Sequence, residues 1–163
     1  MEQVNATQTA TVINSAELLN HWQGHRKLTR RLIEAFPEKE FFEYSIGGMR
    51  TFSGFVQELL TIAVPGLRQI VVGTTDELNH ELDHGNSKQT ILNLWDQATE
   101  DINQYWGQIS DERFHEKILA FGQYEGTIWS TIFYFIDNEI HHRGQAYVYL
   151  RSLGIEPPYF WER

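Results

Sequence analysis

Apolar side chains recur every three or four residues along four stretches of the chain, which is the spacing of one buried face of an α-helix. The first stretch begins at Ser15, a candidate N-cap, and reaches Phe36, where Pro37 ends the pattern. Much of the opposite surface of this helix is basic, which predicts a solvated face formed by four side chains: Arg26, Lys27, Arg30 and Arg31.

The second stretch is capped by Thr51 and ends before Gly73. Pro65 and Gly66 lie inside it and predict a kink or a division into two helices, because proline lacks an amide donor and clashes with the preceding turn. The polar, acidic segment 74–86 fits either a short helix or a connection.

The third stretch is capped by Ser87 and continues to Trp106. The pattern is then broken over 107–125, where we expect a long excursion with some extended structure near 118–121. The last helix is expected to begin near Gly126 or Thr127 and to end at about Leu153, with Gly154 as its left-handed terminator.

Four long amphipathic helices without a convincing run of alternating strands predict an all-α fold, a four-helix bundle with a long connection between helices three and four. The 163 residues fit a single domain, 1–163, in which residues 1–14 form a flexible N-terminus. A hydrophobic content of 41% is enough for a sizeable core.

The charge and cysteine content narrow the function. The net charge is −9, which argues against nucleic acid and against anionic membrane surfaces as partners. The chain has no cysteine, so any metal must be held by histidine, carboxylate or amide groups. The N-terminus does not have the pattern of a signal peptide and no apolar run approaches a membrane span, so we expect a cytoplasmic protein.

Glu58 is a candidate functional residue because it lies at the border of the apolar stripe of the second helix, three residues after Phe55 and four before Ile62. One interpretation is that its side chain leans out to solvent. The other is that the carboxylate is hydrogen-bonded or bound to a cation.

The last helix carries an unusually polar strip. Asn138 and His142 are four residues apart and therefore share a face, which suits two ligands of one metal ion; the alternative is a buried hydrogen-bond network. The spacing alone is weak evidence, since it recurs in two further histidine pairs: His21 with His25, expected on the bundle surface, and His80 with His84. No cysteine, glycine-flanked serine or phosphate-binding loop offers another chemistry, so metal chemistry is the enzymatic route that the residues favour.

The segment from Asp137 to Gln145, followed by Tyr147–Arg151 and Gly154–Pro158, resembles the C-terminal motif of the DinB-like superfamily of bacterial four-helix bundles. Arg50–Phe52 at the start of the second helix and a long first helix with Trp22 add to the resemblance, which covers nearly the whole chain.

The resemblance implies a divalent metal, often zinc or nickel, held by three histidines. Carried over to this sequence, the ligand positions fall on Glu58, Asn138 and His142, so two of the three histidines are replaced. Such a set would favour magnesium, manganese or no ion over zinc. The alternative is that Glu58 accepts a hydrogen bond from His142 and the metal site has become a metal-free polar pocket.

Two functions follow from the resemblance. One is a metal-dependent transferase or hydrolase that acts on a small molecule, of the type in which the metal activates a low-molecular-weight thiol; His141 and Arg143 would then steer an anionic substrate at the mouth of the site. The other is a non-catalytic protein, a dimeric scaffold or a small-ligand binding protein with a degenerate site. A homodimer is expected in either case.

Overall fold

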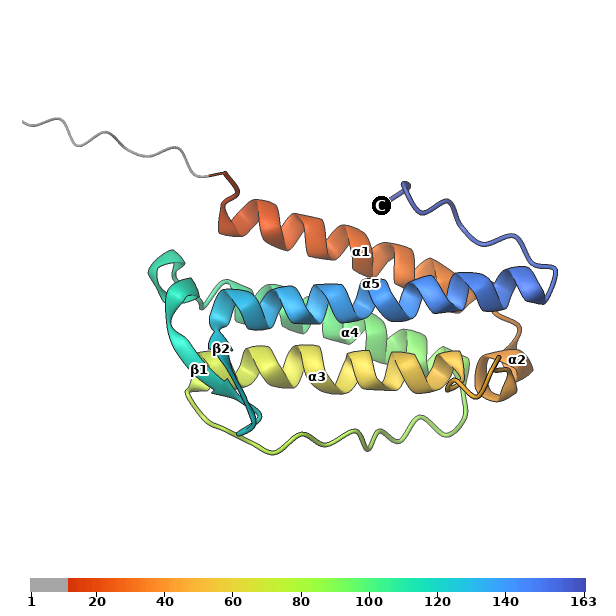
Figure 1. Ribbon diagram of the computed structural model, residues 1–163, viewed down its shortest axis with the longest axis horizontal. Helices are drawn as coiled ribbons and strands as arrows, with labels where there is room; N and C mark the ends of the chain where they lie inside the picture. Colours follow the sequence, from red (N-terminus) through yellow and green to blue (C-terminus); the bar gives the residue numbers. More distant parts are fainter. Residues whose placement is uncertain (1–11) are drawn as a thin grey trace, which may run out of the picture.

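Four long helices lie side by side in the computed structural model, which describes residues 12–163 (Figure 1). Each of α1 and α3 contacts both α4 and α5, so α1 and α3 occupy one diagonal of the bundle. The bounds of these helices are α1 Ser15–Ala35, α3 Phe52–Val72, α4 Lys88–Trp106 and α5 Ile128–Ser152. The predicted all-α four-helix bundle is confirmed.

Side-chain caps begin each long helix. Asn14, and not Ser15, caps α1: its side chain accepts a hydrogen bond from the Glu17 amide at 2.8 Å, while the Glu17 carboxylate accepts one from the Asn14 amide at 2.9 Å. This reciprocal pair satisfies two amides that the first helical turn leaves without partners. The caps of the next two long helices are the predicted Thr51 and Ser87, and Thr127 caps the last, which was expected to begin near Gly126 or Thr127.

Helix α3 is continuous, so the predicted division at Pro65 is wrong. Proline removes only one amide donor, and the buried Ala63 and Leu67 on either side hold the helix against its neighbours. By length and composition α3 could also cross a membrane, which the sequence interpretation missed. However, 56% of its most apolar window is buried inside the bundle, as expected of a core helix.

Two connections shape the bundle. Segment 74–86 contains no helix or strand and runs back along the whole bundle, so that α3 and α4 are parallel (Figure 1). Between α4 and α5, the predicted excursion contains a 3₁₀-helix, η1 (Asp111–His115), and an antiparallel hairpin of β1 (Lys117–Ala120) and β2 (Tyr124–Thr127), in which Ala120 pairs with Tyr124.

A short helix that the sequence did not predict, α2 (Glu38–Glu43), closes the opposite end of the bundle from the hairpin (Figure 1). Its first turn carries Glu38 and Glu40, which suit the positive end of a helix dipole. Phe41 is its buried anchor, packed edge-on against Phe36 and Phe52.

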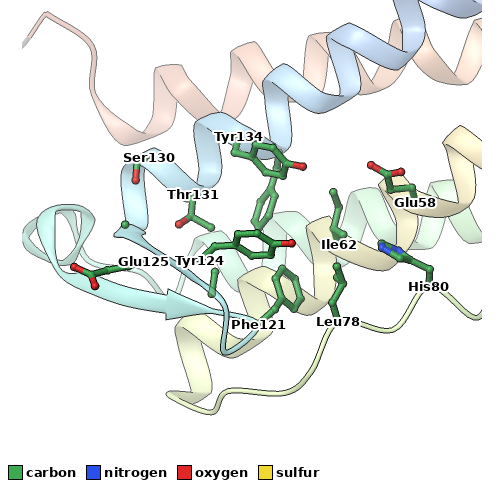
Figure 2. Close-up of a pocket in the computed structure, with 13 residues that line it drawn as sticks. Glu58, Ile62, Leu78, His80, Phe121, Tyr124, Glu125, Ser130, Thr131 and Tyr134 are labelled. Carbon is green, nitrogen blue, oxygen red and sulfur yellow. The ribbon is translucent and has the colours of Figure 1, made fainter.

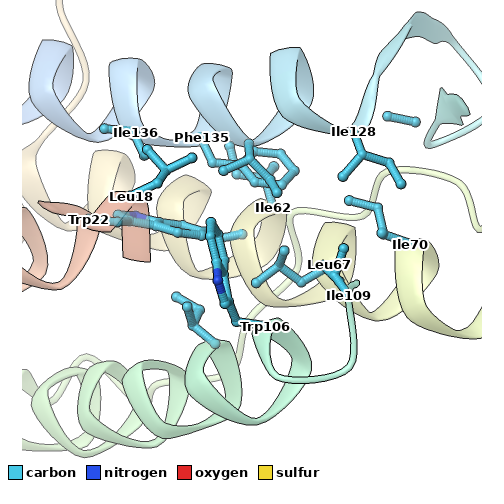
Figure 3. Close-up of a cluster of buried hydrophobic side chains, with 14 of the residues drawn as sticks. Leu18, Trp22, Ile62, Leu67, Ile70, Trp106, Ile109, Ile128, Phe135 and Ile136 are labelled. Atoms are coloured by element: carbon cyan, nitrogen blue, oxygen red, sulfur yellow. The ribbon is translucent and has the colours of Figure 1, made fainter. Parts of the chain in front are cut away.

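The core consists of two apolar clusters. The first lies towards the hairpin and centres on Trp22, Trp106 and Phe135 (Figure 3). The second lies towards α2 and includes Phe52 and Trp95. Along α1, α3 and α5, buried polar residues lie between the members of the two clusters, and this polar layer contains the candidate site.

Candidate functional site

Three polar side chains converge between α3 and α5 in the polar layer. Glu58 comes from α3, and Asn138 and His142 lie one turn apart on α5. Oε1 of Glu58 accepts a hydrogen bond from Asn138 Nδ2 at 3.1 Å and lies 3.3 Å from His142 Nε2. The structure therefore brings together the three residues that the resemblance indicated, while their role as metal ligands stays a prediction.

Arg50 closes this site, although the sequence did not indicate that it would. Its Nη2 lies 2.5 Å from Glu58 Oε2, and its guanidinium carbon lies 5.1 Å from the centre of the Phe55 ring. Phe55 also stacks on His142, with 4.5 Å between ring centres and 13° between planes. The carboxylate thus has a guanidinium on one oxygen and hydrogen bonds on the other.

His142 is held at both ring nitrogens. Nδ1 lies 2.9 Å from Gln145 Oε1, and Nε2 faces Glu58 Oε1. Because an ionised carboxylate only accepts hydrogen bonds, Nε2 carries the proton in this contact. A doubly protonated ring satisfies both contacts, and so does a neutral ring if the Gln145 amide is turned over. In either form the Nε2 lone pair is not available in this arrangement.

Opposing effects act on the Glu58 carboxyl group. Burial alone would raise its pKa, but hydrogen bonds from Arg50 and Asn138, the positive charge of Arg50 and the contact with His142 outweigh burial and hold the pKa below its usual value. The group is therefore ionised at neutral pH. Its side chain is 17% exposed, so it does not lean freely into solvent.

The donor set does not fit a tightly bound metal as it is arranged. One imidazole, one carboxylate and one amide would have to bind the ion, but the imidazole of His142 and the amide of Asn138 are both already bonded to the Glu58 carboxylate. A guanidinium also occupies the second carboxylate oxygen, at Arg50. Within residues 12–163, no three His, Asp or Glu side chains gather closely enough to hold an ion.

A pocket of about 400 Å³ opens beside Glu58, between α3, α5, the hairpin and segment 74–86. Figure 2 shows the hydroxyl groups of Tyr124 and Tyr134 pointing towards the end of the pocket where Glu58 and His80 lie. The remaining walls are mostly apolar and aromatic, and include Ile62, Leu78, Phe121 and Phe135. Nothing in the sequence predicted that the hairpin and segment 74–86 would line this pocket.

The two residues predicted to steer substrate lie elsewhere. His141 is exposed on α5, with its ring centre 5.1 Å from that of His142, and it does not line the pocket. Arg143 faces α1 instead of the mouth of the site and is 6% exposed. It donates hydrogen bonds to the His25 carbonyl oxygen and Thr29 Oγ1, each at 3.2 Å. Its position one residue beyond His142 turns it about 100° away from Glu58.

A buried ionic network lies between α1, α4 and α5. Glu139 accepts hydrogen bonds from Thr29 Oγ1 at 2.5 Å and Trp22 Nε1 at 3.3 Å, with the guanidinium nitrogens of Arg26 and Arg143 at 4.0 and 3.8 Å. The prediction that Arg26 is solvated is therefore wrong. The side chain is 1% exposed, because position 26 lies one turn after Trp22 on the buried face.

His25 completes this network and is also buried, contrary to the expected surface position of the His21 and His25 pair. Its Nδ1 accepts a hydrogen bond from Arg143 Nη2 at 2.8 Å, and its Nε2 lies 3.1 Å from both His21 Nε2 and Arg163 Nη1. Burial, followed by the charges of Arg143, His21 and Arg163, lowers the pKa of His25 to about 3. The ring is therefore neutral at neutral pH.

Solved structures share this fold. A DinB-like protein from Bacillus cereus superposes with a TM-score of 0.72 at 16% identity, over 88% of this chain and 95% of that chain. A DinB-like protein from Bacillus subtilis gives a TM-score of 0.70 at 19% identity, over 90% and 99%. A mycothiol-dependent maleylpyruvate isomerase gives 0.63 at 15% identity, over 82% of this chain but only 61% of its own length.

Comparison with curated protein sequences gives no match. The sequence model of the DinB family, in contrast, matches residues 3–162, which is nearly the whole chain. This match agrees with the fold likeness and with the C-terminal motif on α5. The chain belongs to the DinB family.

Proposed function

We propose that this DinB-family protein binds a small organic amine with an apolar body in the pocket beside Glu58, without a catalytic metal. The single observation that carries the proposal is the lining of the pocket. Aromatic and aliphatic side chains form most of its walls, and ionised Glu58 lies at one end (Figure 2). This combination recognises a cationic or hydrogen-bond-donating group attached to an apolar skeleton.

The charge of the lining sets the ligand class. Glu58 and Glu125 line the pocket, and neither Lys nor Arg does. Burial, together with the charge of Glu58 and the neighbouring Tyr124, raises the pKa of Tyr134, so its phenol stays protonated and available for hydrogen bonding. An anionic ligand would meet carboxylates without a cationic partner inside the pocket, whereas an ammonium group would meet a carboxylate and aromatic faces.

Arg50 supports the metal-free interpretation. In the family pattern three histidines would hold a metal cation at this position, whereas here a carboxylate, Glu58, pairs with the guanidinium of Arg50, which also lies over the Phe55 ring. Arg50 is 54% exposed and can move aside without leaving a buried charge. We therefore expect an incoming ammonium group either to displace Arg50 from the Glu58 carboxylate or to share that carboxylate with Arg50.

The rival proposal is the metal-dependent transferase or hydrolase that activates a thiol. It requires Glu58, Asn138 and His142 to exchange their mutual hydrogen bonds for a zinc, nickel, manganese or magnesium ion, and it requires Arg50 to leave. A metal that binds would stabilise the folded state by mass action, which makes the two proposals separable in one assay.

Thermal unfolding with a matched set of probes tests the proposal. Phenethylamine, phenethyl alcohol and phenylacetate share a ring and differ in charge. We expect phenethylamine to raise the melting temperature with increasing concentration, and Glu58→Gln to abolish that increase. A matched control is Glu77→Gln, which removes an exposed carboxylate that does not line the pocket.

Two results would count against the amine proposal. One is an equal effect of phenethylamine on the parent and on Glu58→Gln. The other is stabilisation by any of the four metal ions in the parent but not in His142→Ala, together with metal in protein purified without an affinity tag; that outcome would favour the metal-dependent enzyme.

A further inference from the structure

A second pocket, of about 450 Å³, lies on another face of α5, beneath the segment that follows the helix. Helix residues Ile140, Arg143, Tyr147 and Arg151 form its floor, and Tyr159 and Trp161 lie on the opposite wall. The segment is fastened to α1 because Arg31 pairs with Glu162, with Nη2 and Oε2 3.1 Å apart. None of these residues lines the pocket beside Glu58.

The charge of this second pocket is opposite to that of the first. Arg143 and Arg151 line it, against one carboxylate, Glu156. Arg143 shares its compensating Glu139 with Arg26, and Arg151 forms no ion pair within the described part of the chain. The guanidinium of Arg143 is already used by His25, Thr29 and Glu139, so Arg151 is the group that offers an anion an uncompensated positive charge in a chain of net charge −9.

The hydroxyl group of Tyr147 is the second observation that points to a ligand. Its oxygen is buried and has no hydrogen-bond partner in the described structure, although buried phenols nearly always have one. Burial raises the pKa of Tyr147, so the hydroxyl keeps its proton and can donate it in a hydrogen bond. The Arg151 guanidinium lies over the same ring, 5.7 Å from its centre.

The opposite wall is aromatic and unusually exposed. Tyr159 and Trp161 stack on each other, with 4.8 Å between ring centres and 10° between planes, and are 50% and 62% exposed. Phe160 beside them is 63% exposed. Three consecutive large apolar side chains at the rim of one pocket are typical of a ligand-binding surface.

We propose that this pocket binds a small aromatic carboxylate. The carboxylate pairs with the Arg151 guanidinium and accepts the hydrogen bond that the Tyr147 hydroxyl group lacks, while the aromatic ring packs against Trp161 and Tyr159. The site takes the opposite charge class to the pocket beside Glu58 and does not depend on the function proposed for that pocket.

Phenylacetate is the probe for this site, measured by isothermal titration and by quenching of Trp161 fluorescence, with Trp161→Phe to assign the signal. We expect saturable binding at one site, weakened about tenfold in Arg151→Gln, because a charge-assisted hydrogen bond is lost. Tyr147→Phe is expected to weaken binding severalfold without lowering the melting temperature, since the hydroxyl group it removes has no partner to lose.

Controls separate this site from the first pocket. Lys117→Gln removes an equal charge from the hairpin and should leave phenylacetate affinity unchanged. Arg151 is exposed, so its replacement leaves the fold intact. Absence of saturable phenylacetate binding, or equal affinity of the parent and Arg151→Gln, would overturn the proposal. Loss of phenethylamine binding alone would overturn only the amine proposal.

Discussion

His25 provides a test of the buried network, because its neutral form is built into the fold. Arg143 donates to Nδ1, which requires a lone pair there, and the charged Arg163 lies against the other ring nitrogen. Protonation of Nδ1 would place its N–H group opposite the N–H group of Arg143. The charged imidazolium ring would then also lie beside the two guanidinium cations of Arg143 and Arg163. We therefore expect acid to destabilise the protein through this residue well before its carboxylates titrate.

The size of the effect follows from the pKa of His25, which folding lowers from 6.5 to about 3. Between these values only the unfolded chain takes up the proton. The contribution of His25 to the free energy of unfolding is therefore fully present above pH 6.5 and decreases as the pH falls towards 3. Linkage gives a loss of about 2 kcal/mol in the free energy of unfolding from about pH 7 to about pH 5. For a chain of this length that is a decrease of about 6 °C in melting temperature.

Urea unfolding at a series of pH values measures this slope in the parent, in His25→Gln and in the control His115→Gln, which changes an exposed histidine. We expect His25→Gln to be less stable than the parent at neutral pH. We also expect it to lack the decrease in unfolding free energy that protonation of His25 causes, so that the difference in stability between parent and variant narrows as the pH falls. Equal slopes in the parent and His25→Gln, or a His25 ring that titrates near pH 6.5 in NMR spectra of the folded protein, would refute the reasoning.

Four further substitutions test the packing by urea unfolding. Glu139→Gln should lower the free energy of unfolding by about 3 kcal/mol, because it leaves buried arginines without a counter-ion. Its control, Asp96→Asn in an exposed ion pair, should lower it by less than about 1 kcal/mol. Equal losses of stability in the two variants would contradict the buried network. Gly66→Ala should cost about 2 kcal/mol, since an added Cβ would lie 2.4 Å from Phe135 Cζ. Gly144→Ala should instead stabilise the protein by about 1 kcal/mol, since a Cβ there meets no atom within 4 Å and the helix gains propensity; a loss of stability would show that this face of α5 is covered.

Periodicity was sufficient to locate the bundle because each long helix buries one continuous stripe. The same logic singled out Glu58 on its helix and the pair Asn138 and His142 on theirs, but it was the resemblance to the DinB-like superfamily that put the three together. The periodicity also indicated that Arg26 is buried, because Arg26 shares the face of Trp22. The prediction placed Arg26 in solvent because the residue is charged. A buried arginine needs partners from α4 and α5, and one helix does not reveal them.

The residues that close the two pockets could not be predicted, because they belong to irregular segments. Arg50 reaches Glu58 after a turn in which Gly47 and Gly48 have φ angles of 60° and 76°, and local sequence does not fix the direction in which such a turn leaves. Phe121 and Tyr124 depend on the placement of the hairpin, and Trp161 depends on the return of the chain over α5. The expected homodimer is a prediction that light scattering in solution would check.

Segment 74–86 forms one wall of the pocket beside Glu58. It contains no helix or strand of its own, and side-chain hydrogen bonds attach it to α3. Gln57 donates to the His80 carbonyl oxygen at 2.5 Å, Thr61 Oγ1 lies 2.9 Å from His80 Nδ1, and Gln69 donates to the Asp76 carbonyl oxygen at 3.2 Å. This wall can therefore change in sequence, or swing open, while the helices keep their packing. Ligand selectivity can accordingly diverge between related proteins at little cost to their stability, and a graft of this segment between two of them would transfer selectivity without rebuilding the bundle.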